Sequence, residues 1–253
     1  MRSAILEVRK LSKRFGGLTA VSELDFDVLE GEILGVIGPN GAGKSTTFNL
    51  IAGAHQASAG EVRFAGESIL GLPPHRIAQR GIMRTFQHNR PFPGMSVVEN
   101  VLVGAHTRFH ANIFGRKSSV EEQANRARVD ELIEFVGLSD CREADVATLS
   151  FGQGRLLEIA RGLAGEPRLM LFDEPAAGLT PAELERVAEV IRGIAARGIA
   201  VLLIEHDMHF LLPLAHRVVV LNFGAKIADG LPDEIRAHPA VTAAYLGSHA
   251  PAR

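Results

Sequence analysis

A glycine-rich segment followed by a lysine and two hydroxyl side chains is the clearest chemical signal in this sequence. It consists of Gly38, Pro39, Asn40, Gly41, Ala42, Gly43, Lys44, Ser45 and Thr46. Glycines permit positive φ angles, so successive backbone N–H groups and the start of a following helix can surround a phosphate. Lys44 would then reach the β- and γ-phosphates, Ser45 would place its hydroxyl on Mg²⁺, and Thr46 could hydrogen-bond a phosphate farther back. The pattern predicts a site for ATP and Mg²⁺; the alternative, a strand-to-helix turn without a ligand, does not explain Lys44 and Ser45 at this offset.

Two adjacent acids follow an apolar, strand-like run later in the chain. Asp173 and Glu174 directly follow residues 168–172. Asp173 is suited to hold Mg²⁺ through water, and Glu174 can point at the attacking water as a general base. Two acids after a strand are more often a solvated strand end, but a phosphate loop in the same chain favours the catalytic interpretation.

Residues 148–155 form a second loop with possible chemistry, and Glu205, His206 and Asp207 follow a further apolar run. The loop reads Thr-Leu-Ser-Phe-Gly-Gln-Gly-Arg. By itself it could be a polar loop that opens a helix over 156–163 with Ser150 as the N-cap. That capping geometry also presents a hydroxyl and free backbone N–H groups, which bind anions.

The order of these motifs resembles the ABC ATPase family. Leu-Ser-x-Gly-Gln at 149–153, the signature loop, lies directly upstream of the acidic strand, and a histidine follows the next strand. The resemblance implies that Ser150, Gly152 and Gln153 close over ATP held by another subunit, which gives two composite sites in a head-to-tail dimer. Loss of the γ-phosphate contacts after hydrolysis would shift the pair toward its open form.

Three further residues take roles through this resemblance. Phe15 matches the aromatic that stacks on adenine, with a core aromatic at a strand end as the alternative. Gln87 matches the glutamine that touches Mg²⁺ or the attacking water and couples the site to a membrane partner, although a lone glutamine is usually a surface residue. His206 matches the histidine that senses the γ-phosphate, although a lone histidine after a strand is more often structural. Gln87 and His206 join Glu174 and Lys44 in the expected catalytic set.

Several stretches beyond the shared motifs resemble the branched-chain amino acid importer ATPases, over essentially the whole chain. They are residues 71–78, 84–87, 92–101, 173–179, 204–208 and 243–247. The resemblance implies a bacterial importer with transmembrane permease subunits, a periplasmic solute-binding protein and a second ATPase subunit, which is a copy or a different protein. Because the ATPase does not contact the solute, urea, amides or aromatic acids remain alternatives.

Four positions depart from the family pattern. Thr180 stands where aspartate or asparagine is usual, so cross-talk between the two sites could be altered. Phe151 replaces a small signature residue, Gly154 a common glutamine, and His216 an expected aspartate. None of these changes removes a phosphate, magnesium or base residue, so we expect competent hydrolysis.

The elements that must position these residues are those of an α/β fold. Residues 5–28 alternate apolar and polar side chains, which predicts an antiparallel sheet. Apolar runs at 33–37, 169–172 and 199–204 predict buried parallel strands, with a helix over 181–197 between the last two. Further expected elements are helices through 50–51, over 97–103 and over 120–137, and a closing hairpin over 217–228. The family resemblance implies a P-loop NTPase core with a mainly parallel sheet, an antiparallel β subdomain and an α-helical subdomain.

We expect residues 1–253 to form a single ABC ATPase domain, with the helical subdomain inserted at about 88–160 into the RecA-like core. Of 253 residues, 46% are hydrophobic and 22% charged, which is typical of a folded protein. A net charge of −2, with 27 scattered basic residues, argues against nucleic acid as a partner.

The sequence also carries an expectation for the cellular location. It lacks a secretory signal, an internal disulfide is impossible with Cys141 as its single cysteine, and there is no apolar run long enough to span a bilayer. We therefore expect a cytoplasmic chain, peripheral on the inner face of the bacterial cell membrane through its partner.

Two rival classes share some of these motifs. DNA-maintenance ABC ATPases form the same composite sites, but they separate their motifs by long coiled coils, whereas here residues 88–149 alone lie between Gln87 and Ser150. A nucleotide-gated regulator without catalysis is disfavoured because both Glu174 and His206 are present.

Overall fold

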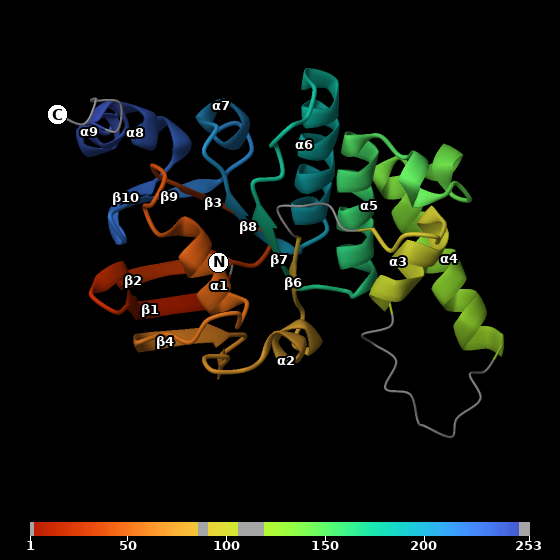
Figure 1. Cartoon of the computed structure of the whole chain (residues 1–253), viewed down its shortest axis with the longest axis horizontal. Coiled ribbons are helices and arrows are strands. Elements are labelled where there is room, and N and C mark those ends of the chain that lie inside the picture. Colours follow the sequence, from red (N-terminus) through yellow and green to blue (C-terminus); the bar gives the residue numbers. More distant parts are fainter. Residues whose placement is uncertain (1–2, 86–90, 106–118, 248–253) are drawn as a thin grey trace.

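Two β-sheets with helices packed around them make up the structure, a computed structural model (Figure 1). It describes residues 3–85, 91–105 and 119–247, and the side chains at 119–122 and 246–247 lie outside the description. In the view of Figure 1, the smaller sheet lies on one side of the larger one, with α1 (Lys44–Ile51) beside it, and most of the remaining helices lie on the other side.

The larger sheet has six described strands in the order β10-β9-β3-β8-β7-β6. They are β3 (Ile33–Ile37), β6 (Ile82–Arg84), β7 (Leu169–Asp173), β8 (Ala200–Ile204), β9 (Arg217–Asn222) and β10 (Ala225–Gly230). Neighbouring strands run parallel except for the β9–β10 hairpin at one edge. The predicted mainly parallel sheet and its closing hairpin are therefore confirmed.

Strand β7 illustrates why the parallel strands are apolar without interruption. Leu169 and Leu171 point into the core shared with the smaller sheet, whereas Met170 and Phe172 point into the core under the helices. All four side chains are inaccessible to solvent. A strand covered on both faces has no solvated side, so the alternating pattern of a half-exposed strand is absent.

The smaller sheet is antiparallel, in the order β2-β1-β4-β5. Its strands are β1 (Ala4–Phe15), β2 (Leu18–Leu29), β4 (Ala59–Phe64) and β5 (Glu67–Ser68). The alternation over residues 5–28 predicted the first pair, and that prediction is confirmed. The short, charged strands β4 and β5 were not predicted, since β4 carries only two buried side chains, Val62 and Phe64.

The described helices vary widely in length. Besides α1 they are α2 (Pro74–Gln79), α3 (Val97–Ala105), α4 (Ser119–Val136), α5 (Phe151–Ala164), α6 (Pro181–Ala196), α7 (Met208–Leu211), α8 (Pro232–Ala237) and α9 (Pro239–Gly247). Short 3₁₀ turns lie at Ser139–Cys141 and Val146–Thr148. Helices were predicted after the phosphate loop, over 97–103, 120–137 and 181–197, and after Ser150, and all are present.

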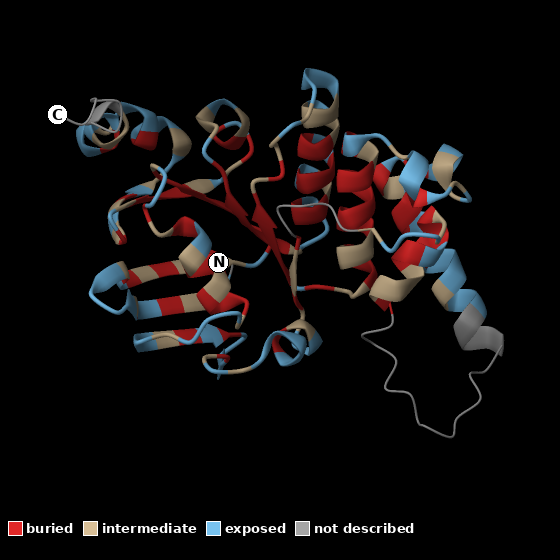
Figure 2. Ribbon diagram, viewed as in Figure 1, coloured by how far each residue is buried: buried red, intermediate tan, exposed pale blue. Residues whose placement is uncertain are grey.

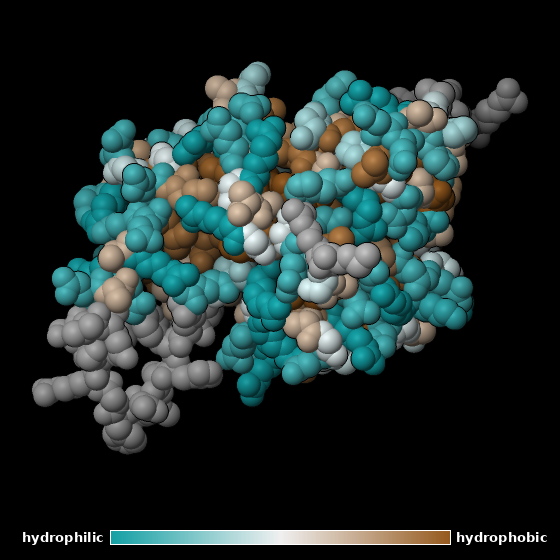
Figure 3. All heavy atoms as spheres, turned by 180° about the vertical axis from the view of Figure 1, so that it is seen from behind, coloured by the Kyte–Doolittle hydropathy of each residue, from teal (hydrophilic) through white to brown (hydrophobic). Residues whose placement is uncertain are grey.

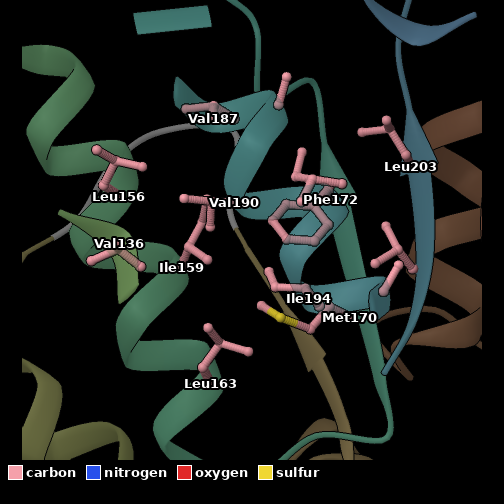
Figure 4. Close-up of a cluster of buried hydrophobic side chains, with 14 of the residues drawn as sticks. Val136, Leu156, Ile159, Leu163, Met170, Phe172, Val187, Val190, Ile194 and Leu203 are labelled. Carbon is pink, nitrogen blue, oxygen red and sulfur yellow. The ribbon is translucent and has the colours of Figure 1, made fainter. Parts of the chain in front are cut away.

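Helices α4, α5 and α6 share one core with the larger sheet. Figure 4 shows Val136 of α4 facing Leu156 and Ile159 of α5, with Val190 of α6 and Phe172 of β7 beside them. Figure 2 shows exposed outer faces on α4 and α6, as amphipathic helices require, whereas α5 is buried or half-buried after its first residue. A helical subdomain over about 88–160 stays a prediction, because α5 runs past that boundary to Ala164 and residues 88–90 and 106–118 lie outside the description.

The outer surface bears on whether the described part of the chain contains a membrane-spanning helix. Seen from behind, it is mainly hydrophilic, with hydrophobic residues showing in patches between the hydrophilic ones on both halves (Figure 3). No helix within residues 3–85, 91–105 and 119–247 has both the length and the apolar composition needed to cross a membrane.

Candidate active site

The carboxyl ends of three neighbouring strands carry the residues singled out from the sequence. The phosphate loop, residues 38–46, follows β3, while Glu174 follows β7 and His206 lies just beyond β8. Strand β8 lies between β3 and β7, and all three run parallel. The topology therefore brings segments more than 100 residues apart to one sheet edge, where ligands bind in open parallel sheets.

The phosphate loop is held closed by its own lysine. Lys44 is buried, and its Nζ donates hydrogen bonds to the carbonyl oxygens of Gly38, at 2.7 Å, and Pro39, at 3.1 Å. Burial lowers the pKa of Lys44, and the nearby carboxylates of Glu174, Asp173 and Glu205 oppose that shift. The nearby carboxylates thus favour the charged form of a largely desolvated amine, and that cation is the group suited to bind phosphate.

Gly43 shows why this loop needs glycine at the start of α1. Its φ of 98° lies in the left-handed region, and a Cβ there would stand 2.5 Å from the carbonyl oxygen of Ala20. Any side chain would therefore force the loop away from β2. With glycine, the loop lies against β2, and the backbone N–H groups at the start of α1 stay available for an anion.

A pocket of about 520 Å³ opens over this loop. It is lined by Phe15, Leu18, Thr19, Ala20, Asn40, Gly41, Ala42, Gly43, Lys44, Ser45, Thr46, Glu174 and Phe223. Phe15, expected to stack on adenine, has 44% of its surface exposed, contacts His55 edge-on and lies under the Lys13 ammonium. One open pocket thus contains an aromatic side chain, the phosphate-binding backbone and a carboxylate.

Asp173, the expected magnesium ligand, is buried at the end of β7 and paired with Arg84. The Arg84 guanidinium donates to Asp173 Oδ2 at 2.8 Å and to Asn49 Oδ1 at 2.7 Å. Among the described residues no cluster of three or more acidic, histidine or cysteine side chains could hold a metal alone. A single carboxylate such as Asp173 fits Mg²⁺, which typically takes one or two carboxylates together with substrate phosphates rather than a cage of protein ligands.

Glu174, predicted as the general base, and His206, predicted to sense the γ-phosphate, lie next to each other. Glu174 Oε1 is 3.7 Å from His206 Nδ1, and the Glu174 N–H donates to the carbonyl of Ile204 at 3.0 Å. Glu174 has a φ of 50°, a left-handed value that non-glycine residues rarely adopt. This backbone conformation turns the chain at the point where the Glu174 side chain enters the pocket.

Glu205 is buried next to this pair of residues. Its side chain is fully buried, its Oε1 accepts a hydrogen bond from the Ala176 N–H at 2.9 Å, and its Oε2 lies 3.9 Å from His206 Nδ1. Burial raises the pKa of Glu205, and the bond from Ala176 partly offsets that rise. Glu205 therefore connects the segment after Glu174 to the segment containing His206.

The signature loop, residues 149–153, does not line the pocket. Ser150 caps α5: its hydroxyl accepts the Gln153 N–H at 3.2 Å, and Gln153 Oε1 accepts the Ser150 N–H at 2.9 Å. The Gln153 amide also donates to Cys141 Sγ at 3.3 Å. Figure 1 places α5 beside α4, on the far side of the larger sheet from α1. The structure therefore brings Ser150, Gly152 and Gln153 together with one another, not with the phosphate loop of the same chain.

Two of the departures from the family pattern have structural roles. Thr180 is the N-cap of α6 in a capping box with Glu183, a position at which threonine also caps, although less strongly than asparagine or aspartate. His216 Nδ1 accepts the Ile33 N–H at 2.8 Å, which joins the start of β9 to β3. Nothing in the structure explains why Gly154 stands in place of glutamine. Gln87, predicted as a magnesium and catalytic residue, lies outside the described residues.

The site and its surroundings also contain residues that sequence reasoning did not single out. Phe223, 87% exposed at the tip of the β9–β10 turn, lines it, and the same turn donates a hydrogen bond from Gly224 to the carbonyl of Ala42. Arg84 and Glu205 are the ion-pair and hydrogen-bond partners described above. The predicted hairpin located the Phe223 turn, but only the three-dimensional arrangement places this exposed aromatic over the phosphate loop.

Comparison with protein families agrees with this geometry. Residues 21–177 match the family model described as ABC transporter. Residues 225–251 match the model described as branched-chain amino acid ATP-binding cassette transporter. The first match spans the phosphate loop, the signature loop and Glu174, and the second begins at β10.

Individual relatives extend over almost the whole chain. The high-affinity branched-chain amino acid transport ATP-binding protein BraF of Pseudomonas aeruginosa is 43% identical over 98% of this chain and 99% of its own length. The corresponding LivG protein of Escherichia coli K12 is 38% identical over 98% and 99%. The crystal structure of an ABC transporter ATP-binding cassette in its ADP conformation superimposes with a TM-score of 0.85 at 30% identity, covering 97% of this chain and 99% of that chain.

Proposed function

Because the chain belongs to the ABC transporter ATP-binding family, we propose that it is the ATP-hydrolysing subunit of an importer for branched-chain amino acids or closely related solutes. The observation that carries the ATPase assignment is the approach of Glu174 and His206, 3.7 Å apart, at the edge of the pocket formed by the phosphate loop. The aliphatic substrate class is supported by the similarity to BraF and LivG and by the match of residues 225–251.

The pocket orients ATP along its length. Backbone N–H groups of residues 38–46 and the N-terminus of α1 bind the β- and γ-phosphates, and Lys44 exchanges its bonds to Gly38 and Pro39 for phosphate oxygens. Phe15 stacks on the adenine, and Phe223, which lines the same pocket, provides a second apolar contact. This arrangement fixes the γ-phosphate on the side where Glu174 enters.

Mg²⁺ would be held by the Ser45 hydroxyl, by Asp173 and by Gln87, and when bound it would neutralise the charge that develops on the transferred phosphoryl group. Ser45 is exposed in the first turn of α1. Arg84 fixes the Asp173 carboxylate through one oxygen, Oδ2, and leaves the other oxygen for the ion or its water.

Glu174 performs the proton transfer. Its carboxylate accepts a proton from the water that attacks the γ-phosphate, so hydroxide character develops only as the new P–O bond forms and the bond from the γ-phosphorus to the bridging oxygen breaks, with ADP as the leaving group. His206, 3.7 Å from Glu174, hydrogen-bonds the γ-phosphate and holds the base in line with the reacting water. Glu205 keeps both residues in register through its bond to Ala176.

Transport requires a second ATPase subunit. Ser150, Gly152 and Gln153 lie outside their own pocket, so they are assigned to the ATP of an opposing subunit, either a second copy or a different chain. Closure over two ATP molecules and opening after hydrolysis would drive transmembrane permease subunits on the cytoplasmic side, and a periplasmic binding protein would select the solute.

The proposal is tested by isolating the complex from native membranes in mild detergent with ATP and identifying the copurifying chains by mass spectrometry. Recovery of two hydrophobic permease subunits and an ATPase partner is expected. Uptake of radiolabelled leucine, compared with urea and phenylalanine, then identifies the solute, with urea, amides and aromatic acids as the competing classes. Recovery of DNA-bound partners without any permease would overturn the transport assignment in favour of a DNA-maintenance ATPase.

A further inference from the structure

The carboxylate of Glu183 joins the starts of two helices. Its Oε2 accepts hydrogen bonds from the Thr180 N–H, at 3.0 Å, and the Thr180 hydroxyl, at 2.9 Å, which caps α6. Its Oε1 accepts hydrogen bonds from the Ser150 hydroxyl and the Gly152 N–H, both at 3.2 Å. The bonds from Thr180 lower the pKa of Glu183, so the side chain is an anion at neutral pH.

Helix capping accounts for only half of these contacts. A capping box needs Thr180 alone, whereas Ser150 and Gly152 lie 33 and 31 positions away in the sequence. A Cβ on Gly152 would stand 2.5 Å from the carboxyl carbon of Glu183, so the approach depends on glycine at that position. The signature loop therefore provides a fitted site for an oxygen anion, and Glu183 occupies it.

We propose that Glu183 is an internal anion that takes the γ-phosphate-binding groups of the signature loop and must leave them before an opposing ATP can bind. This inference rests on the proposed function, which assigns the Ser150 hydroxyl and the Gly152 N–H to the γ-phosphate. Each of those groups has a single proton to donate, so it cannot fully serve both anions. A carboxylate and a γ-phosphate at the same donors would also repel each other.

The exchange is feasible because Glu183 is near the surface. Its side chain is only partly covered, so its carboxylate can turn into water without a large desolvation change. The start of α6 keeps Pro181 at its first position and the Thr180 hydroxyl bond to the Glu183 N–H, at 3.4 Å, when the carboxylate leaves. The competition would raise the ATP concentration needed for closure and would keep the signature loop ordered in the open subunit.

The test compares two charge-removing variants in a Glu174→Gln background, which traps the closed pair. Glu183→Gln keeps the shape and one oxygen for capping Thr180, while Glu185→Gln on the same helix removes an exposed charge that forms an ion pair with Arg192. The chain is purified with its opposing ATPase subunit, and closure is followed by light scattering during an ATP titration. We expect Glu183→Gln to lower the ATP midpoint several-fold and Glu185→Gln to leave it unchanged.

Hydrogen exchange on the nucleotide-free chain provides a second measurement. The amide of Gly152 should exchange faster in Glu183→Gln than in the parent or in Glu185→Gln, and thermal unfolding of each variant reports whether it is folded. An unchanged or higher ATP midpoint in a folded Glu183→Gln variant would overturn the displacement. Failure of the Glu174→Gln pair itself to close with ATP would instead overturn the composite site of the proposed function, and the displacement with it.

Discussion

The phosphate loop and the signature loop each lead into the N-terminus of a helix, yet their polar groups are satisfied in different ways. In the phosphate loop, Lys44 bonds to the carbonyls of Gly38 and Pro39 within six residues of itself. In the signature loop, the donors Ser150 and Gly152 bond to Glu183, more than 30 residues away on another helix. The conformation of the phosphate loop is determined by nearby residues, and that of the signature loop by a tertiary contact. Substitutions around the phosphate loop should therefore affect ATP binding and hydrolysis in the same subunit, and substitutions in the signature loop should affect hydrolysis at the opposing subunit.

The largest expected effect is on the hydrolysis step in the pocket over the phosphate loop, which Glu174 lines. Glu174→Gln removes the proton acceptor but keeps the size of the side chain, so the turnover number should fall by about 10²- to 10⁴-fold while ATP binding persists. Steady-state phosphate release and equilibrium binding of ATP check this, with Glu189→Gln on the surface of α6 as the control. Equal turnover in Glu174→Gln and the parent would remove Glu174 from the role of base.

The next effect separates binding from chemistry in the same region. Lys44→Ala deletes a charged donor from the phosphate loop, and hydrogen bonds to charged groups contribute about 1.5 to 3 kcal/mol. The Kd for ATP should therefore rise roughly tenfold to 100-fold, as measured by fluorescence titration. Lys226→Ala, which removes a lysine paired with Asp229, is the matched control. A Kd unchanged by Lys44→Ala would place the phosphates elsewhere.

Ser150→Ala tests the second region by itself. Loss of one donor to the γ-phosphate should slow hydrolysis about tenfold, while the Kd for ATP in the same subunit stays unchanged, since Ser150 does not line that pocket. Mixing the Ser150→Ala and Lys44→Ala chains should restore one intact composite site per dimer if the chain pairs with itself. Mixed pairs that contain one intact site and still show no recovery would count against the head-to-tail arrangement.

The smallest expected effect concerns Phe223, which lines the pocket over the phosphate loop. Phe223→Ala removes an exposed aromatic contact worth about 1 kcal/mol, the lower end of the range for base stacking, and should raise the Kd for ATP about fivefold. Leu231→Ala, an exposed apolar residue that does not line the pocket, should have no effect. Equal affinity of Phe223→Ala and the parent for ATP would mean that Phe223 does not contact the adenine, which Phe15 would then bind alone.

What could be predicted follows the same division between local and tertiary coding. Lys44, Asp173 and Glu174 were predicted because short spacings on a strand and a loop determine where their side chains point. The parallel strands were equally readable, since both faces of each are buried and their composition is uniformly apolar. The capping of α5 by Ser150 was predicted for the same local reason.

The residues that escaped prediction depend on pairs far apart in the chain. Arg84 and Asp173, separated by 89 positions, meet only because β6 and β7 are neighbours in the sheet. Glu183 has the sequence pattern of an ordinary capping residue, and its second oxygen finds Ser150 only once α5 and α6 lie together. Thr180 departs from the family pattern without structural consequence at the helix start, because its hydroxyl serves as a cap.

The bond between Glu205 and Ala176 has a mechanical consequence. It fastens together two loops that are 29 positions apart, one containing His206 and the other running from Glu174 to Thr180. That second loop ends where Glu183 begins its contacts with the start of α5. A continuous path of hydrogen bonds and main chain therefore runs from the loop containing His206, through Glu205 and Glu183, to the signature loop at the start of α5, which supplies a physical route for coupling the two loops.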